Sequence, residues 1–97
     1  MRGEPLTSAT HPELIAWVDA NARLEQLCQR GGWPDGATLR MDVCSREGKE
    51  MIANVFLIEA VREISVCEPV REERCGKFAI IFDAAGKPES IRLLYPM

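Results

Sequence analysis

The sequence predicts a two-layer α+β domain, in which one N-terminal helix packs on an antiparallel sheet of four or five strands arranged as a meander. Three observations support this fold class. Apolar residues recur at helical spacing between residues 14 and 28, they alternate with polar residues after residue 38, and short turns with Gly or Pro separate the later apolar segments. Short turns make neighbouring strands antiparallel. The 97 residues suffice for one domain, which we expect over residues 10–97 after a flexible arm at residues 1–9.

The helix is expected to begin after Thr10 and to end at about Arg30. Thr10 is a favourable N-cap, Glu13 can close a capping box with it, and Pro12 fits the first turn. Gly31 is typical of the position just after a helix. One side of this helix is apolar, which is the pattern of a helix lying on another layer, and the residues of that side are Leu14, Ile15, Trp17, Val18, Ala22, Leu24 and Cys28.

The middle of the chain is expected to form strands. Residues 39–43 alternate between apolar and polar, and residues 46–48 predict a hairpin turn with Gly48 at a position that favours positive φ. Residues 50–67 are apolar on all sides and rich in β-branched side chains, which favours a strand covered on both faces. Because this segment is long for one strand, we expect a break near Glu59–Ala60 and a second strand through residues 64–66. A helix over residues 49–63 is the alternative.

The last third of the sequence predicts a charged loop and a hairpin. Residues 70–74 are mostly charged and follow Pro69, so we expect them to form a loop. Residues 77–83 and 90–95 alternate as strands do, and a turn at residues 83–88 joins them. The resulting layout of one helix on a meander is similar to cystatin-type and nuclear-transport-factor-type folds, and no motif places the chain in a family.

The charge balance excludes some classes of partner. Twelve Lys and Arg stand against fifteen Asp and Glu, a formal net charge of −3, and no basic stripe occurs. Nucleic acid and anionic membranes are therefore not expected as partners. No apolar run approaches the ~20 residues of a membrane helix, and the first residues do not resemble a secretory signal. We therefore expect a cytoplasmic protein with reduced thiols.

Catalytic and metal-binding patterns are weak. Cys28, Cys44, Cys67 and Cys75 are widely spaced, with no Cys-x-x-Cys pair, so we expect no metal site and treat them as small buried residues; convergence of the four thiols on zinc is the alternative. His11 is the one histidine, and it stands where the helix begins. The sequence indicates no catalytic residue and no cofactor, and it leaves enzymatic activity open.

The expected function is that of a small acidic cytoplasmic interaction module, an adaptor or an inhibitor. One helix can cover one face of the sheet, so the apolar residues on the other face predict self-association as a homodimer or binding of a protein partner. The candidate binding residues are Trp17, Trp33, Arg71, Glu72 and Arg74. The alternative is a small-molecule pocket between helix and sheet, lined by Leu14, Val18, Phe56, Phe78 and Phe82.

Overall fold

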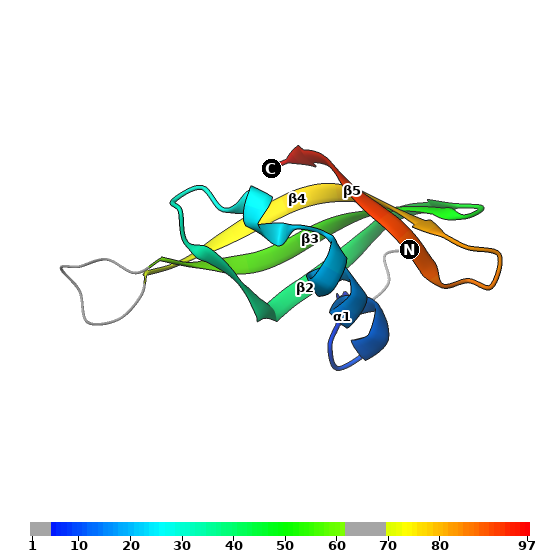
Figure 1. Ribbon diagram of the computed structural model, residues 1–97, viewed down its shortest axis with the longest axis horizontal. Helices are drawn as coiled ribbons and strands as arrows, with labels where there is room; N and C mark the ends of the chain where they lie inside the picture. Colours follow the sequence, from blue (N-terminus) through cyan, green and yellow to red (C-terminus); the bar gives the residue numbers. More distant parts are fainter. Residues whose placement is uncertain (1–4, 62–69) are drawn as a thin grey trace.

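The computed structural model describes residues 5–61 and 70–97, which form one helical layer and one sheet. The elements are β1 (Leu6–Thr7), α1 (Pro12–Asn21), the 3-10 helix η1 (Leu24–Leu27), β2 (Trp33–Glu47), β3 (Glu50–Val61), β4 (Val70–Phe82) and β5 (Pro88–Pro96). The strands lie in the order β1-β2-β3-β4-β5, and every neighbouring pair is antiparallel. Both helical elements lie on the same side of this sheet (Figure 1). The predicted two-layer α+β meander is confirmed.

The helix is shorter than the sequence predicted. It ends at Asn21, because Arg23 adopts a left-handed backbone conformation with φ of 51°. The chain then turns into η1, which places Leu24 and Leu27 in the core. The apolar side of the helix was thus predicted correctly, but its continuation to Arg30 was wrong, because the bend lets these two leucines reach the sheet.

The predicted capping box at the start of the helix is also wrong. His11 occupies the N-cap position and makes no capping bond through its side chain. The Thr10 hydroxyl is instead engaged with Thr7, since it accepts from the Thr7 backbone N–H at 2.9 Å and donates to the Thr7 carbonyl at 3.3 Å. Residues 6 and 7 pair with β2, so this part of the predicted arm lies on the sheet.

The central strand confirms part of the prediction for residues 50–67. β3 runs without a break from Glu50 to Val61, so the helical alternative and the break near Glu59–Ala60 are both wrong. The strand predicted at residues 64–66 lies outside the described residues. Residues 70–74 are not a loop, because they pair along their whole length with β3 as the first part of β4. β2 likewise begins at Trp33, earlier than the alternating pattern indicated.

The core lies between the helices and one face of the sheet. Side chains of β3 alternate strictly, so that every second residue from Met51 to Glu59 is buried on the side of α1. Phe78 and Ile80 of β4 lie on the same face and are fully buried. The other residues of this cluster are Ile15, Val18, Ala22, Leu24, Leu27, Leu39, Met41 and Phe82. The β2–β3 and β4–β5 hairpins lie together at one end of the sheet (Figure 1), and Gly48 makes the first of these turns with φ of +56° as predicted.

A close approach of two backbones at Gly32 gives the first prediction. A Cβ atom at this position would overlap the carbonyl oxygen of Ala60 and lie 2.9 Å from a methyl group of Val61. Backbone atoms of β3 cannot move aside without disturbing the sheet, so Gly32→Ala is expected to lower the free energy of unfolding by about 1–3 kcal/mol, measured by urea denaturation.

Gly36→Ala is the matched control, because the three atoms nearest to its added Cβ belong to the flexible carboxylate of Asp19. We expect this variant to lose less free energy of unfolding than Gly32→Ala. Equal losses for the two substitutions would contradict the claim that contact with the Ala60 backbone limits residue 32 to glycine.

Candidate functional site

A buried carboxylate joins the loop before β2 to the sheet. Glu59 of β3 is 0 % exposed. Its carboxylate accepts hydrogen bonds from the backbone N–H groups of Gln29 at 2.8 Å, Arg30 at 3.1 Å and Gly32 at 2.8 Å, and from Nε of Arg74 at 2.8 Å. These four donors compensate the loss of water around the charge. The carboxylate therefore fixes residues 29–32 against β3.

The same environment sets the ionisation of Glu59. Burial alone raises the pKa of a carboxyl group, but the three backbone hydrogen bonds and the Arg74 guanidinium favour the charged form more strongly and lower the pKa of Glu59 to about 2. Arg74 also bonds Glu72 at 2.6 Å, and Glu72 bonds Arg30 at 2.8 Å. Hydrogen bonds from Arg74 and Arg30 lower the pKa of Glu72. Every group of this cluster is thus engaged, which is the pattern of a structural junction rather than of an open site.

The candidate residues at 71–74 are divided between the two faces of the sheet. Glu72 and Arg74 point to the helix side, where they belong to the Glu59 cluster. Arg71 points to the opposite side and bonds Asp35 at 2.7 Å, and this hydrogen bond lowers the pKa of Asp35. Trp33 lies on that opposite side, opposite Ala60 in the register of β2 and β3, and is 48 % exposed. The sequence grouped these residues because it treated 70–74 as a loop, whereas neighbours on a strand face opposite ways.

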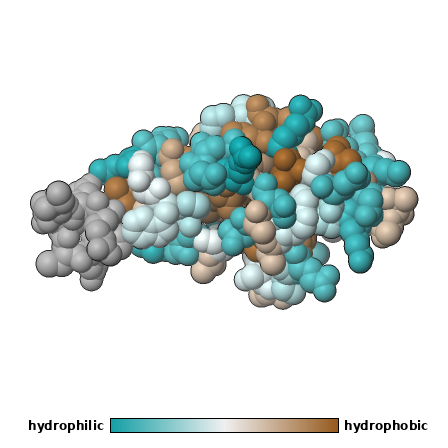
Figure 2. Space-filling model, in the orientation of Figure 1, coloured by the Kyte–Doolittle hydropathy of each residue, from teal (hydrophilic) through white to brown (hydrophobic). Residues whose placement is uncertain are grey.

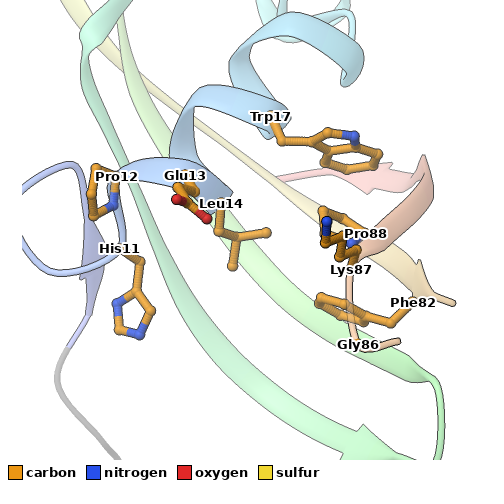
Figure 3. Close-up of a pocket in the computed structure, with 9 residues that line it drawn as sticks. All are labelled: His11, Pro12, Glu13, Leu14, Trp17, Phe82, Gly86, Lys87 and Pro88. Atoms are coloured by element: carbon orange, nitrogen blue, oxygen red, sulfur yellow. The ribbon is translucent and has the colours of Figure 1, made fainter. Parts of the chain in front are cut away.

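A groove separates the first turns of α1 from the β4–β5 hairpin. Its volume is about 640 Å³, within the range of small-molecule sites. The residues that line it are His11, Pro12, Glu13, Leu14, Trp17, Phe82, Gly86, Lys87 and Pro88. In Figure 3, Leu14 points into the space between His11 and Phe82, and Trp17 extends towards Pro88 and Lys87. Trp17, predicted on the apolar side of the helix and as a candidate binding residue, is half-buried and packs against the core from this groove.

The polar groups of the groove are few. His11 lies at its edge, with Nδ1 at 3.0 Å from the Thr10 hydroxyl, and Glu13 and Lys87 supply one charge of each sign. The predicted pocket differed in part, because Val18 and Phe78 are fully buried in the core and Phe56 lies on the far side of the sheet. An apolar groove with a few polar groups at its rim suits binding of an amphipathic molecule. Figure 2, which shows the helix-bearing side, has apolar surface between hydrophilic areas.

The opposite side of the sheet, called here the helix-free face, has no covering element among residues 5–61 and 70–97. Its side chains alternate with those of the core. The apolar and aromatic residues on it are Trp33, Ile52, Phe56, Ile58, Ala79, Ile81 and Tyr95. Long basic side chains lie over two of the rings: the Arg40 guanidinium is 4.4 Å from the centre of Phe56, and the Lys77 ammonium is 5.6 Å from that of Tyr95.

Three features were missed by sequence reasoning. Sequence reasoning placed Glu59 only at an expected break between strands, although a single acid within a long apolar segment is a signal of a buried, paired charge. Asn54 interrupts the same segment and lies at the centre of the helix-free face. Lys87 and Pro88 were assigned only to a turn, and no local pattern could show that the helix start would lie beside them.

The described thiols Cys28 and Cys75 lie at different places in the fold. Cys28 directly precedes Gln29, whose N–H binds Glu59, Cys75 lies on the helix-free face, and burial raises the pKa of both. Cys28, Cys44 and Cys75 are free, and Cys67 lies outside the described residues. In the part of the chain that the structure describes, no group of three His, Cys, Asp or Glu side chains could hold a metal ion. Within the same residues, no helix is long and apolar enough to cross a membrane.

Comparisons with protein-family models, with curated proteins and with solved structures find no match to this chain.

The Glu59 junction gives a prediction of pH dependence. Its pKa is lowered from about 4.5 to about 2 on folding, so the stability that its ionisation provides is fully present above pH 4.5 and is lost as the pH falls through 2. Glu59→Gln removes this contribution and one of the two carboxylates that pair with the buried Arg74, and is expected to lower the Tm at pH 7 by on the order of 10 °C or more.

Glu72→Gln is the matched control, because the Glu72 side chain is partly exposed. This substitution should therefore lower the Tm less than Glu59→Gln does. Thermal unfolding followed by circular dichroism between pH 7 and pH 2 makes the comparison. The gap in Tm between the native chain and Glu59→Gln should narrow below pH 4.5. A gap that stays constant down to pH 2 contradicts the assignment.

Proposed function

We propose that this protein is a small interaction module that self-associates as a homodimer through the helix-free face of its sheet and acts as an adaptor or inhibitor in the cytoplasm. The observation that carries the proposal is the uncovered row of apolar side chains on β3. Ile52, Phe56 and Ile58 lie on that face outside the core cluster, and burial of such a surface by association is favourable.

Two further observations support binding rather than catalysis as the role. Arg71, Glu72 and Arg74 are engaged in ion pairs within the chain, and the described thiols with raised pKa are poor nucleophiles. A cytoplasmic location is proposed because the sequence has the composition of a reduced, soluble protein. Its net charge of −3 without a basic stripe favours a protein partner over nucleic acid.

Self-association predicts a mass above that of one chain. Ile52→Lys places a charge in the centre of the helix-free face and is expected to raise the dissociation constant at least tenfold, since burying an unpaired charge is costly. Light scattering coupled to size-exclusion chromatography over a range of concentrations measures this dissociation constant.

Ala20→Lys is the control, because Ala20 is exposed on α1, away from this face. The native chain and this control should associate alike. If the native chain has the mass of a monomer at every concentration, the proposed self-association is wrong.

A second candidate function is binding of a small amphipathic molecule in the groove, favoured by its volume of about 640 Å³ and its apolar lining. The two tryptophans provide an internal comparison, because Trp17 lines the groove and Trp33 lies on the helix-free face. On titration with 1-anilinonaphthalene-8-sulfonate, the indole N–H signal of Trp17 should shift in ¹H–¹⁵N spectra while that of Trp33 stays fixed. An unchanged Trp17 signal rejects this candidate.

A further inference from the structure

We propose that two copies of this chain pack their helix-free faces about a two-fold axis that runs along β3 next to Asn54, so that Asp42 of each copy faces Lys77 of the other. This inference rests on the proposed self-association and specifies its geometry. It starts from three side chains that the register places side by side: Asn54 is opposite Asp42 on β2 and opposite Lys77 on β4.

Asn54 has a carbonyl oxygen that lacks a donor. Its Oδ1 is buried and has no hydrogen-bond partner among the described residues. A buried acceptor without a partner costs about 1–3 kcal/mol, and such groups are rare in folded proteins. Lys77, its neighbour on β4, makes no hydrogen bond to it; the Lys77 ammonium instead interacts with Tyr95, which raises the pKa of Lys77. Because Oδ1 is buried within the single chain, this pairing requires the Asn54 side chain to rotate towards the axis, where the amide of the second Asn54 supplies the missing N–H donor.

The charges beside Asn54 select the direction of the axis. When two sheets pack face to face, a two-fold axis must lie in the plane between them. An axis along β3 exchanges the β2 and β4 sides, and it therefore places Asp42 opposite Lys77 twice. An axis across the strands would place Asp42 opposite Asp42 and Lys77 opposite Lys77. Since like charges across an interface are costly, the first arrangement is favoured.

The apolar neighbours of Asn54 fit the same axis. Residues of β3 meet their own counterparts, so Phe56 faces Phe56 and Ile52 faces Ile52 of the other copy. Ala79, which is opposite Ile52 on β4, is 1 % exposed, so Ile52 rather than Ala79 provides the surface at this contact. Packed sheets are separated by roughly 10 Å, a distance that two asparagine side chains span with a hydrogen bond between them.

The contact is confined to the centre of the face. Farther along β3, the axis would bring Asp35 opposite Glu73 of the other copy. Twisted sheets diverge away from the point where they cross, and Arg71 already neutralises Asp35. A central contact of this kind is smaller than a standard protein–protein interface, so we expect a dissociation constant in roughly the micromolar range.

Charge reversal tests this arrangement. Asp42→Lys gives two Lys–Lys contacts per dimer, and Lys77→Asp gives two Asp–Asp contacts. Each single variant is therefore expected to have a dissociation constant at least about tenfold higher than that of the native chain. The double variant exchanges the two charges and should associate within about threefold of the native chain. An equimolar mixture of the two single variants should form a heterodimer. Sedimentation equilibrium gives each dissociation constant, and circular dichroism checks that every variant is folded.

The outcomes separate this inference from the function on which it rests. Weakened single variants with a restored double variant support the axis along β3. A native dimer whose dissociation constant is unchanged in both single variants overturns the axis and leaves self-association intact. A native chain that is monomeric up to millimolar concentration overturns both.

Discussion

The buried carboxylate of Glu59 is the interaction on which the rest of the structure depends. It accepts hydrogen bonds from three backbone N–H groups between residues 29 and 32 and from the guanidinium of Arg74. These bonds hold the loop that follows η1 against β3, and they thereby determine where β2 begins and which face of the sheet the helical layer covers. Because the charge is compensated on all sides, it stabilises one arrangement of the chain and penalises others in which the loop leaves the sheet.

The helical layer covers one face of the sheet, and the helix-free face has no such cover among the described residues. The helical layer is short, since α1 has ten residues and η1 four, and it is used entirely on the side of Glu59. On the far side, apolar side chains are shielded only in part by the stems of Arg40 and Lys77. Residues 5–61 and 70–97 provide no further element to cover them, and a second copy would bury them while pairing the Asn54 amide. The groove beside α1 is independent of this face, so ligand binding and self-association would not compete for the same surface.

Much of the fold could be predicted from the sequence, because the apolar residues of its helix and strands recur at regular spacings. The helical stripe around Val18, the alternation in β4 and β5, and the β-branched composition of β3 all predicted the correct element types. The ends of the helix and of the strands were predicted less well. Leu24 and Leu27 continue the helical pattern, yet the bend at Arg23 depends on where the sheet lies. Residues 70–74 are charged, yet their partners Asp35 and Glu59 are distant in sequence and turn a presumed loop into a strand. The conformational preferences of neighbouring residues do not predict these long-range pairings. The groove could not be predicted for the same reason, because it forms between α1 and the β4–β5 hairpin, which are distant in sequence.

The central claim is that the helix-free face is the contact between two copies, and nuclear Overhauser effects between them test it most directly. A sample that mixes ¹³C-labelled and unlabelled chains, recorded with an isotope filter, reports only protons of different copies that lie within about 5 Å, the scale of side-chain contact. The account predicts such effects for Ile52 and Phe56 of the helix-free face and none for Leu14 or Pro88 of the groove. Effects confined to the groove residues, or none at a concentration where the chain is dimeric, would contradict it.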